Sequence, residues 1–173
     1  DWKVFARSNH LYTKTFEEET NTVCYLVIDT SASMGYAGKR SPCNKLRYAV
    51  MAAAALAYLA IRQGDAVGLF AYGEGVIDWI EPRTGQDHLQ AVYQSLAKLE
   101  PSGKSNHAKA WPKLLGRLPG RGLVLYFSDM LEAEEELPEH LKFGQSVRYD
   151  CLSFQILDPD ELDLPYKEAL EFA

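Results

Sequence analysis

Thr22-Val-Cys-Tyr-Leu-Val-Ile-Asp-Thr-Ser-Ala-Ser33 is an apolar run that ends in a cluster of oxygen-bearing side chains. The apolar part, up to Ile28, is rich in β-branched and aromatic residues, which is typical of a strand covered on both faces of a sheet. Asp29, Ser31 and Ser33 follow where this strand stops. Carboxylate and hydroxyl oxygens are hard donors of the kind that hold Mg²⁺. The stretch therefore predicts a buried strand with a cation site at its carboxyl end.

The first half of the chain continues with a helix and a hairpin. An alanine-rich, largely apolar segment from Asn44 to Gln63 predicts a helix, and Gly64 stands where that helix should end. The segment Asp65 to Tyr72 has the composition of the next strand. A tight turn at residues 73–75 then leads into a strand at residues 76–80. We expect these two strands to pair as an antiparallel hairpin.

Two more helices are predicted in the middle of the chain. Thr84 and Asp87 have the spacing of a capping box, and an apolar face with helical periodicity follows them. That face comprises Leu89, Val92, Tyr93, Leu96 and Leu99. The next helix is expected to begin at Ser105 or Asn106, with a kink or a restart at Pro112, because proline removes a backbone hydrogen bond.

The remaining segments complete an alternating pattern of strands and helices. Residues 123–127 form a second buried-type strand that ends in Ser128 and Asp129, residues 132–142 read as a polar helix, and residues 147–157 as a further strand. Residues 11–16 are compatible with an edge strand. The alternation predicts a three-layer α/β domain with a mostly parallel, doubly wound, Rossmann-like sheet and one antiparallel edge strand. We expect residues 1–173 to form a single domain.

Composition limits the possible partners and the compartment. The net charge of −6 argues against nucleic acid, because proteins that bind it usually present a basic face. The longest apolar stretch, residues 48–61, is too short to span a membrane. Cys24, Cys43 and Cys151 have no metal or redox spacing, and this usage suits a reducing compartment, so we expect a cytoplasmic protein. The chain does not start with Met, and we expect it to be a fragment of a longer protein.

The predicted topology brings separated polar residues to one edge of the sheet. In open α/β sheets, ligands bind beyond the carboxyl ends of the strands. Asp29 and Asp129 occupy two such ends and would face one crevice if their strands are neighbours. A turn at residues 102–106 precedes a predicted helix and could bring Ser105 to the same crevice.

The Asp-x-Ser-x-Ser string that begins at Asp29, together with Asp129 after a later strand, resembles the metal-ion-dependent adhesion site of the von Willebrand factor type A domain. Ser105 stands where that family usually has Thr, and Asn106 stands where relatives often have Asp. The resemblance implies one divalent cation, Mg²⁺ with Mn²⁺ or Ca²⁺ as alternatives, and an open coordination position for an acidic side chain of a partner protein. The ligands it implies are Asp29, Ser31, Ser33, Ser105 and Asp129.

Four segments of the chain resemble one bacterial subgroup of that family, known as domain of unknown function fifty-eight. They are residues 1–7, 16–21, 29–34 and 157–162. The resemblance implies a binding module rather than an enzyme, working as an adaptor with a MoxR-type AAA+ ATPase as its partner. We expect the loop at residues 35–44, which is rich in Gly, Lys and Arg and follows the site, to determine selectivity.

A metal-dependent phosphohydrolase is the alternative function. Such an enzyme needs a general base or a basic phosphate clamp beside the cation, and the expected crevice offers hydroxyls, Asn106 and Lys104. Gly103-Lys104-Ser105 matches the end of a phosphate-binding loop, but Lys98 stands where that pattern needs glycine. Ser31 stands where an aspartyl-phosphate phosphatase of the haloacid dehalogenase type places its second Asp. The binding module is therefore the favoured interpretation.

Overall fold

The computed structural model describes residues 22–104, 106–118, 121–131 and 149–163. The predicted edge strand at residues 11–16 and the predicted polar helix at residues 132–142 lie outside the described residues, as does Ser105.

In the described residues, five strands form one sheet in the order β3-β2-β1-β4-β5. They are β1 (Val23–Asp29), β2 (Ala66–Tyr72), β3 (Val76–Arg83), β4 (Gly122–Ser128) and β5 (Tyr149–Gln155). The pairs β1–β2, β1–β4 and β4–β5 are parallel, whereas β3 is antiparallel to β2. The prediction of a mostly parallel α/β sheet with one antiparallel edge strand is confirmed.

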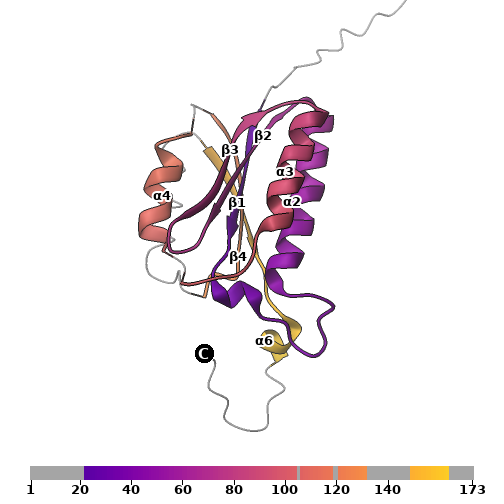
Figure 1. Ribbon diagram of the computed structural model, residues 1–173, viewed down its shortest axis with the longest axis vertical. Coiled ribbons are helices and arrows are strands. Elements are labelled where there is room, and N and C mark those ends of the chain that lie inside the picture. The colour runs from indigo at the N-terminus through magenta and orange to yellow at the C-terminus, as the bar shows by residue number, and fades with distance from the viewer. Residues whose placement is uncertain (1–21, 105, 119–120, 132–148, 164–173) are drawn as a thin grey trace, which may run out of the picture.

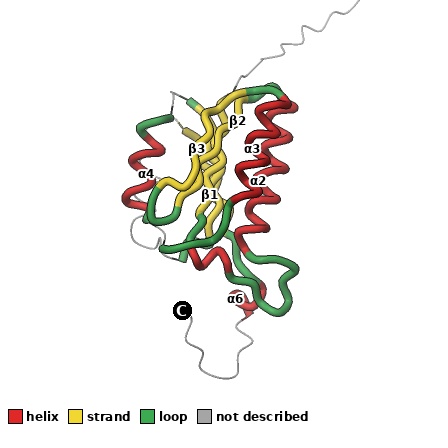
Figure 2. The backbone as a smooth tube through the Cα atoms, in the orientation of Figure 1, coloured by secondary structure: helices red, strands yellow, loops and turns green. Residues whose placement is uncertain are grey.

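Helices cover both faces of this sheet (Figure 1). The helical elements are η1 (Ala32–Gly35), α2 (Lys45–Arg62), α3 (Gln86–Lys98), α4 (His107–Leu115) and α6 (Pro159–Asp163). Figure 1 shows α2 and α3 together on one side of the sheet and α4 on the other. The short α6 lies below the sheet in this view, near the loop that connects η1 to α2. Figure 2 shows that the loops after β1 and the segment before α6 gather at the same end.

The alternation of side chains along β1 divides the core between the two faces. Leu26 and Ile28 belong to a cluster with α2 and α3, whereas Tyr25 and Val27 belong to a second cluster with α4. All four side chains are at most 1% exposed. A strand that contributes to two cores has to be apolar at nearly every position, which explains the unbroken run in the sequence.

The structure contradicts the predicted cap of α3 and excludes one of the two alternatives expected at Pro112. Thr84 does not cap α3, because the residue before the helix is Gly85, with a φ of 98° and no side-chain capping bond. α4 runs through Pro112 without restarting. Asn106 is confirmed as the residue that begins α4, since its Oδ1 accepts a 3.0 Å hydrogen bond from the Lys109 N–H.

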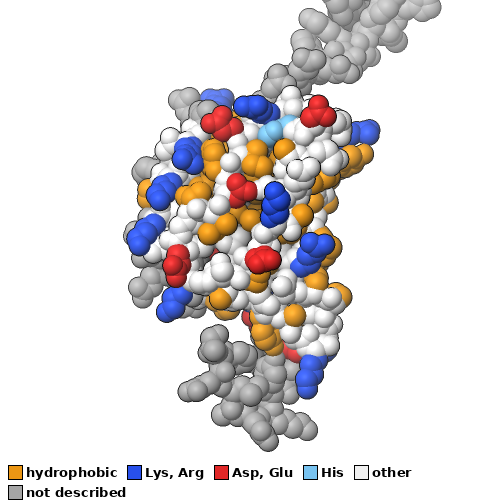
Figure 3. Space-filling view, in the orientation of Figure 1, with side chains coloured by type: hydrophobic (Ala, Val, Ile, Leu, Met, Phe, Trp, Pro, Cys, Tyr) orange, Lys and Arg blue, Asp and Glu red, His pale blue; other side chains and the backbone are white. Residues whose placement is uncertain are grey.

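The outer surface of β3 and its surroundings is mixed in character. Figure 3 shows acidic, basic and apolar side chains interspersed on this face, with Lys and Arg side chains along the edge formed by α4. β3 extends to Arg83, beyond the predicted end at residue 80, and includes Pro82. An edge strand tolerates proline because one of its sides has no neighbouring strand that needs the missing N–H.

Candidate functional site

The buried carboxylate of Asp29 is fixed at the end of β1 by two hydrogen bonds. Its Oδ1 accepts a 2.9 Å bond from the Ser31 backbone N–H, and its Oδ2 accepts a 2.7 Å bond from the Ser128 hydroxyl. Asp29 is 1% exposed, and β1 and β4 are parallel neighbours. The strands that precede Asp29 and Asp129 are therefore neighbours, which is the condition under which the two carboxylates would face one crevice.

Ser31 and Ser33 bring two hydroxyl oxygens together just beyond Asp29. Ser31 precedes η1 but makes no side-chain capping bond to that helix. Its hydroxyl instead forms a 3.0 Å hydrogen bond with the Ser33 hydroxyl, in which either oxygen can be the donor. Ser31 is buried and Ser33 is half-buried, so the pair lies at the edge of the core.

Backbone hydrogen bonds attach the turn predicted at residues 102–106 to this end of β1. The Ser102 N–H donates to the Thr30 carbonyl at 2.8 Å, and the Ala32 N–H donates to the Gly103 carbonyl at 2.8 Å. The Asn106 N–H donates to the Gly73 carbonyl at 3.0 Å. The structure thus places residues on either side of Ser105 against the ends of β1 and β2, while Ser105 itself lies outside the described residues.

Asp129 follows β4 and carries a partner that the sequence interpretation did not include. Its Oδ2 accepts a 2.8 Å hydrogen bond from the Lys45 ammonium, and both side chains are 2% exposed. The Oδ1 of Asp129 accepts a 3.2 Å bond from the Leu131 N–H. Met130 between them has a φ of 62°, so the chain turns sharply just after the carboxylate.

The polar groups expected in the crevice were hydroxyls, Asn106 and Lys104. The structure adds Lys45 to them. Lys45 is the first residue of α2 and shares its buried face with Ala49 and Ala53 at a spacing of four. That spacing was the one sequence feature that could have indicated a buried Lys45. It does not suffice alone, because lysine is rarely buried unless it is paired. Here the ammonium also lies 2.6 Å from Glu161 Oε1 on α6.

A buried tyrosine pair on β2 and β4 lies within electrostatic reach of the two carboxylates. The hydroxyls of Tyr72 and Tyr126 are 2.8 Å apart and buried. Burial raises the pKa of Tyr126 above its ordinary value, hydrogen bonds with Ser128 and Tyr72 oppose this, and the charges of Asp29 and Asp129 raise it further. Tyr126 therefore stays neutral and adds no charge to the site.

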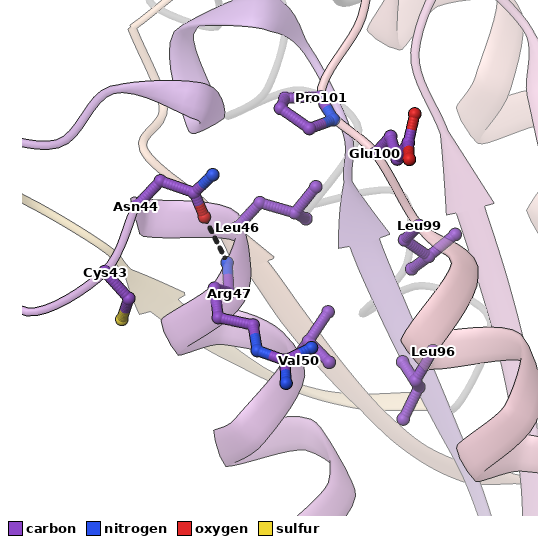
Figure 4. Close-up of a pocket in the computed structure, with 9 residues that line it drawn as sticks. All are labelled: Cys43, Asn44, Leu46, Arg47, Val50, Leu96, Leu99, Glu100 and Pro101. Carbon is purple, nitrogen blue, oxygen red and sulfur yellow. Dashed lines mark hydrogen bonds between the residues drawn. The ribbon is translucent and has the colours of Figure 1, made fainter.

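A separate hollow of about 330 Å³ lies between the start of α2 and the end of α3 (Figure 4). Leu46, Val50, Leu96 and Leu99 give it an apolar floor. At its rim the Asn44 Oδ1 accepts a 2.8 Å hydrogen bond from the Arg47 N–H, so this oxygen caps α2. Of the predicted metal ligands that the structure describes, none lines this hollow.

The donors at the sheet edge fit a hard cation better than a soft one. Across the described part of the chain, no three His, Cys, Asp or Glu side chains gather where they could hold a metal ion. The predicted ligand set contains two carboxylates and otherwise depends on serine hydroxyls. Such oxygens suit Mg²⁺, Mn²⁺ or Ca²⁺. All three cysteines are free thiols, and Cys24 is buried, with a pKa raised to about 12 by burial and then by the charge of Asp65.

The chain belongs to the family described as Protein of unknown function DUF58, which matches residues 1–173. Two of its relatives are Uncharacterized protein Rv1480 of Mycobacterium tuberculosis (strain ATCC 25618 / H37Rv) and Uncharacterized protein Mb1516 of Mycobacterium bovis. Each is 27% identical over 168 residues, which cover 95% of this chain and 52% of the relative. The chain thus spans about half the length of the curated relatives it matches.

Solved structures share the fold. BatB from Bacteroides thetaiotaomicron, a conserved hypothetical protein, aligns with a TM-score of 0.57 and 14% identity, over 76% of this chain and 65% of that one. An aerotolerance-related membrane protein from Bacteroides fragilis NCTC 9343 aligns with a TM-score of 0.60 and 16% identity, over 80% and 69%. At these identities the likeness concerns the fold alone. In the described residues of the present chain, no helix is both long and apolar enough to cross a bilayer.

Proposed function

We propose that this domain is a von Willebrand factor type A-like module that binds one divalent cation, Mg²⁺ in the first place, and uses it to recruit an acidic side chain of a partner protein. The proposed ligands are Asp29, Ser31, Ser33, Ser105 and Asp129.

The observation that carries this proposal is the 3.0 Å separation of the Ser31 and Ser33 hydroxyl oxygens. Two adjacent ligands of an octahedral ion with bonds of about 2.1 Å lie about 3.0 Å apart. The Asp29 carboxylate is held beside this pair by the Ser31 N–H, so a charged donor is present next to two neutral ones. When bound, the ion would supply a positive charge that attracts one more oxygen ligand.

The charges around the crevice support a binding module over a phosphohydrolase. A phosphate clamp needs a cation that is available to the substrate. The ammonium of Lys45 reaches this region, but it is already hydrogen-bonded to Asp129 and Glu161. We therefore propose no catalytic activity.

For the partner we propose a MoxR-type AAA+ ATPase, and the support for it is the sequence resemblance alone. For the compartment we propose the cytoplasm, supported by three free thiols in the described residues. Retention of an ATPase of this class on the immobilised chain in Mg²⁺, and its release by a chelator, is the expected result. Retention that is unchanged by the chelator would contradict a metal-bridged contact.

Calorimetric titration of Mg²⁺ into the chain tests the cation site. Binding should be lost in Asp29→Ala and weakened at least tenfold in Ser33→Ala, whose half-buried side chain makes its removal easier to tolerate. Ser153→Ala, which removes an exposed hydroxyl on β5, is the matched control and should bind as the unchanged chain does. Equal affinity in all four proteins would overturn the proposed site.

A further inference from the structure

Lys45 is a buried cation joined to two carboxylates from different elements. It is 3% exposed, and its Nζ lies 2.8 Å from Asp129 Oδ2 and 2.6 Å from Glu161 Oε1. Its ammonium also lies 5.8 Å from the centroid of the Tyr36 ring. A buried charge is tolerated only where such partners compensate for its lost hydration. The position of Lys45 therefore depends on both carboxylates.

Glu161 is in turn fixed within the segment at residues 158–163, which we name the docked segment. Its Oε2 accepts a 2.8 Å hydrogen bond from the Asp158 N–H, so one carboxylate connects the start of the segment to Lys45. Figure 1 shows α6, which forms most of this segment, below the sheet and next to the loop before α2.

The docked segment is attached to that loop by hydrogen bonds from several groups. Asp158 Oδ2 accepts bonds from the Gly38 N–H at 2.9 Å and from the Ser41 hydroxyl at 2.5 Å. Asp160 accepts bonds from the Lys39 N–H at 3.1 Å and from Arg40 Nε at 2.6 Å. The segment that carries Glu161 is thus anchored independently of Lys45.

We propose that Lys45 is a positioning residue that lowers the cation affinity of the site, and that the docked segment sets the size of this effect through Glu161. This inference rests on the proposed function. The Lys45 ammonium cancels the charge of one of the two carboxylates that face the crevice and would compete with a divalent ion for Asp129. Glu161 draws the same ammonium toward the docked segment and so relieves part of that competition.

Two substitutions should change the affinity in opposite directions, which general damage to the fold would not do. In calorimetric titrations with Mg²⁺, Lys45→Met should bind at least tenfold more tightly than the unchanged chain, because a like charge next to the ion is removed. Glu161→Gln should bind at least about threefold more weakly. Of the two carboxylates that now share the Lys45 ammonium, only Asp129 then keeps its negative charge. Mg²⁺ should also raise the Tm of Lys45→Met more than that of the unchanged chain.

Matched controls separate the specific effect from a general change in net charge. Lys39→Met removes an exposed cation from the same loop, and Asp163→Asn removes an exposed anion from α6 that pairs with Arg40. Both should stay within twofold of the unchanged chain. Denaturant unfolding verifies that each variant is folded. If Lys45→Met does not fold, the Mg²⁺ affinity of Glu161→Gln compared with that of Asp163→Asn tests the inference.

The outcomes distinguish this inference from the function it rests on. Suppose that the unchanged chain binds Mg²⁺ and that this binding requires Asp29. Binding that is not tighter in folded Lys45→Met, or not weaker in Glu161→Gln than in Asp163→Asn, then overturns the inference alone. No Mg²⁺ binding by the unchanged chain overturns the proposed function itself.

Discussion

The Ser128 hydroxyl donates a 2.7 Å hydrogen bond to Asp29 Oδ2, and both side chains are at most 1% exposed. The same Oγ accepts a 2.9 Å bond from the Met130 N–H. Ser128 therefore connects the carboxyl ends of β1 and β4 and also stabilises the turn that presents Asp129. One hydroxyl orients the surroundings of both carboxylates proposed to hold the cation.

Replacing Ser128 by Ala should lower both stability and cation affinity. Loss of the hydroxyl removes the buried hydrogen bond to Asp29 and the partly buried one from the Met130 N–H, which should cost about 1–3 kcal/mol in the free energy of unfolding, measured by urea denaturation. Calorimetry should show weaker Mg²⁺ binding, since Asp29 loses the group that holds one of its oxygens. Ser153→Ala is the control, and a Ser128→Ala chain with the affinity of that control would show that this bond does not position Asp29.

Ser105→Thr restores the residue that the von Willebrand factor type A family usually has at this place. Thr keeps the hydroxyl and restricts its rotation, so Mg²⁺ affinity should rise or stay the same. Ser102→Thr, on an exposed position of the same loop, should leave affinity unchanged. A marked loss of binding in Ser105→Thr alone would show that the third loop has been assigned incorrectly.

The attachment of the docked segment should be sensitive to acid through Asp158. Burial alone would raise the pKa of this carboxyl, but hydrogen bonds from Ser41, Gly38 and the Asp160 N–H, with the charge of Lys45, outweigh it and hold the pKa below its usual value. A lowered pKa in the folded state stabilises the protein above the unfolded pKa of about 3.9, and this contribution is lost as the pH falls through the folded value.

Asp158→Asn should therefore lower the free energy of unfolding by about 1–3 kcal/mol near pH 7, and the difference from the unchanged chain should shrink as the pH falls below about 4. Urea denaturation at a series of pH values measures this difference. Asp163→Asn, at a position with an exposed side chain, is the control. A difference that stays constant or grows on acidification would contradict the assignment.

Gly122 allows β1, β4 and β5 to approach closely. A Cβ at this position would lie 2.5 Å from the Val23 carbonyl oxygen and 2.8 Å from Tyr149 Cε1. Gly122→Ala should therefore destabilise the fold by about 1–3 kcal/mol or more, measured by thermal or urea unfolding. Gly75→Ala, where nothing lies within 4 Å, is the matched control and should differ little from the unchanged chain.

The sheet could be predicted from the sequence because its strands are apolar runs with clear ends. Ile28 and Phe127 each precede the polar residues that end β1 and β4, and Gly64, with a φ of 87°, lies just beyond α2 as expected. The cap of α3 was predicted one residue too early, at Thr84, because Gly85 precedes the helix without a side-chain capping bond.

Less of the candidate site could be predicted, because the residues that hydrogen-bond to its carboxylates belong to no sequence motif. Ser128 ends an apolar strand, and only the register of β4 beside β1 places its hydroxyl against Asp29. Lys45 and Glu161 are 116 residues apart, and no local pattern pairs them. Tertiary packing determines such contacts, whereas the Asp-x-Ser-x-Ser string is visible in the sequence alone.

Diffraction from crystals of the chain grown with Mn²⁺, with anomalous data collected at the Mn absorption edge, tests the cation site most directly. We expect one strong anomalous peak at the carboxyl end of β1, within about 2.0–2.3 Å of the Ser31 and Ser33 hydroxyl oxygens, with Asp29 and Asp129 facing it. A map with no peak at this position, or with Asp29 and Asp129 directed away from one another, would contradict the proposed site.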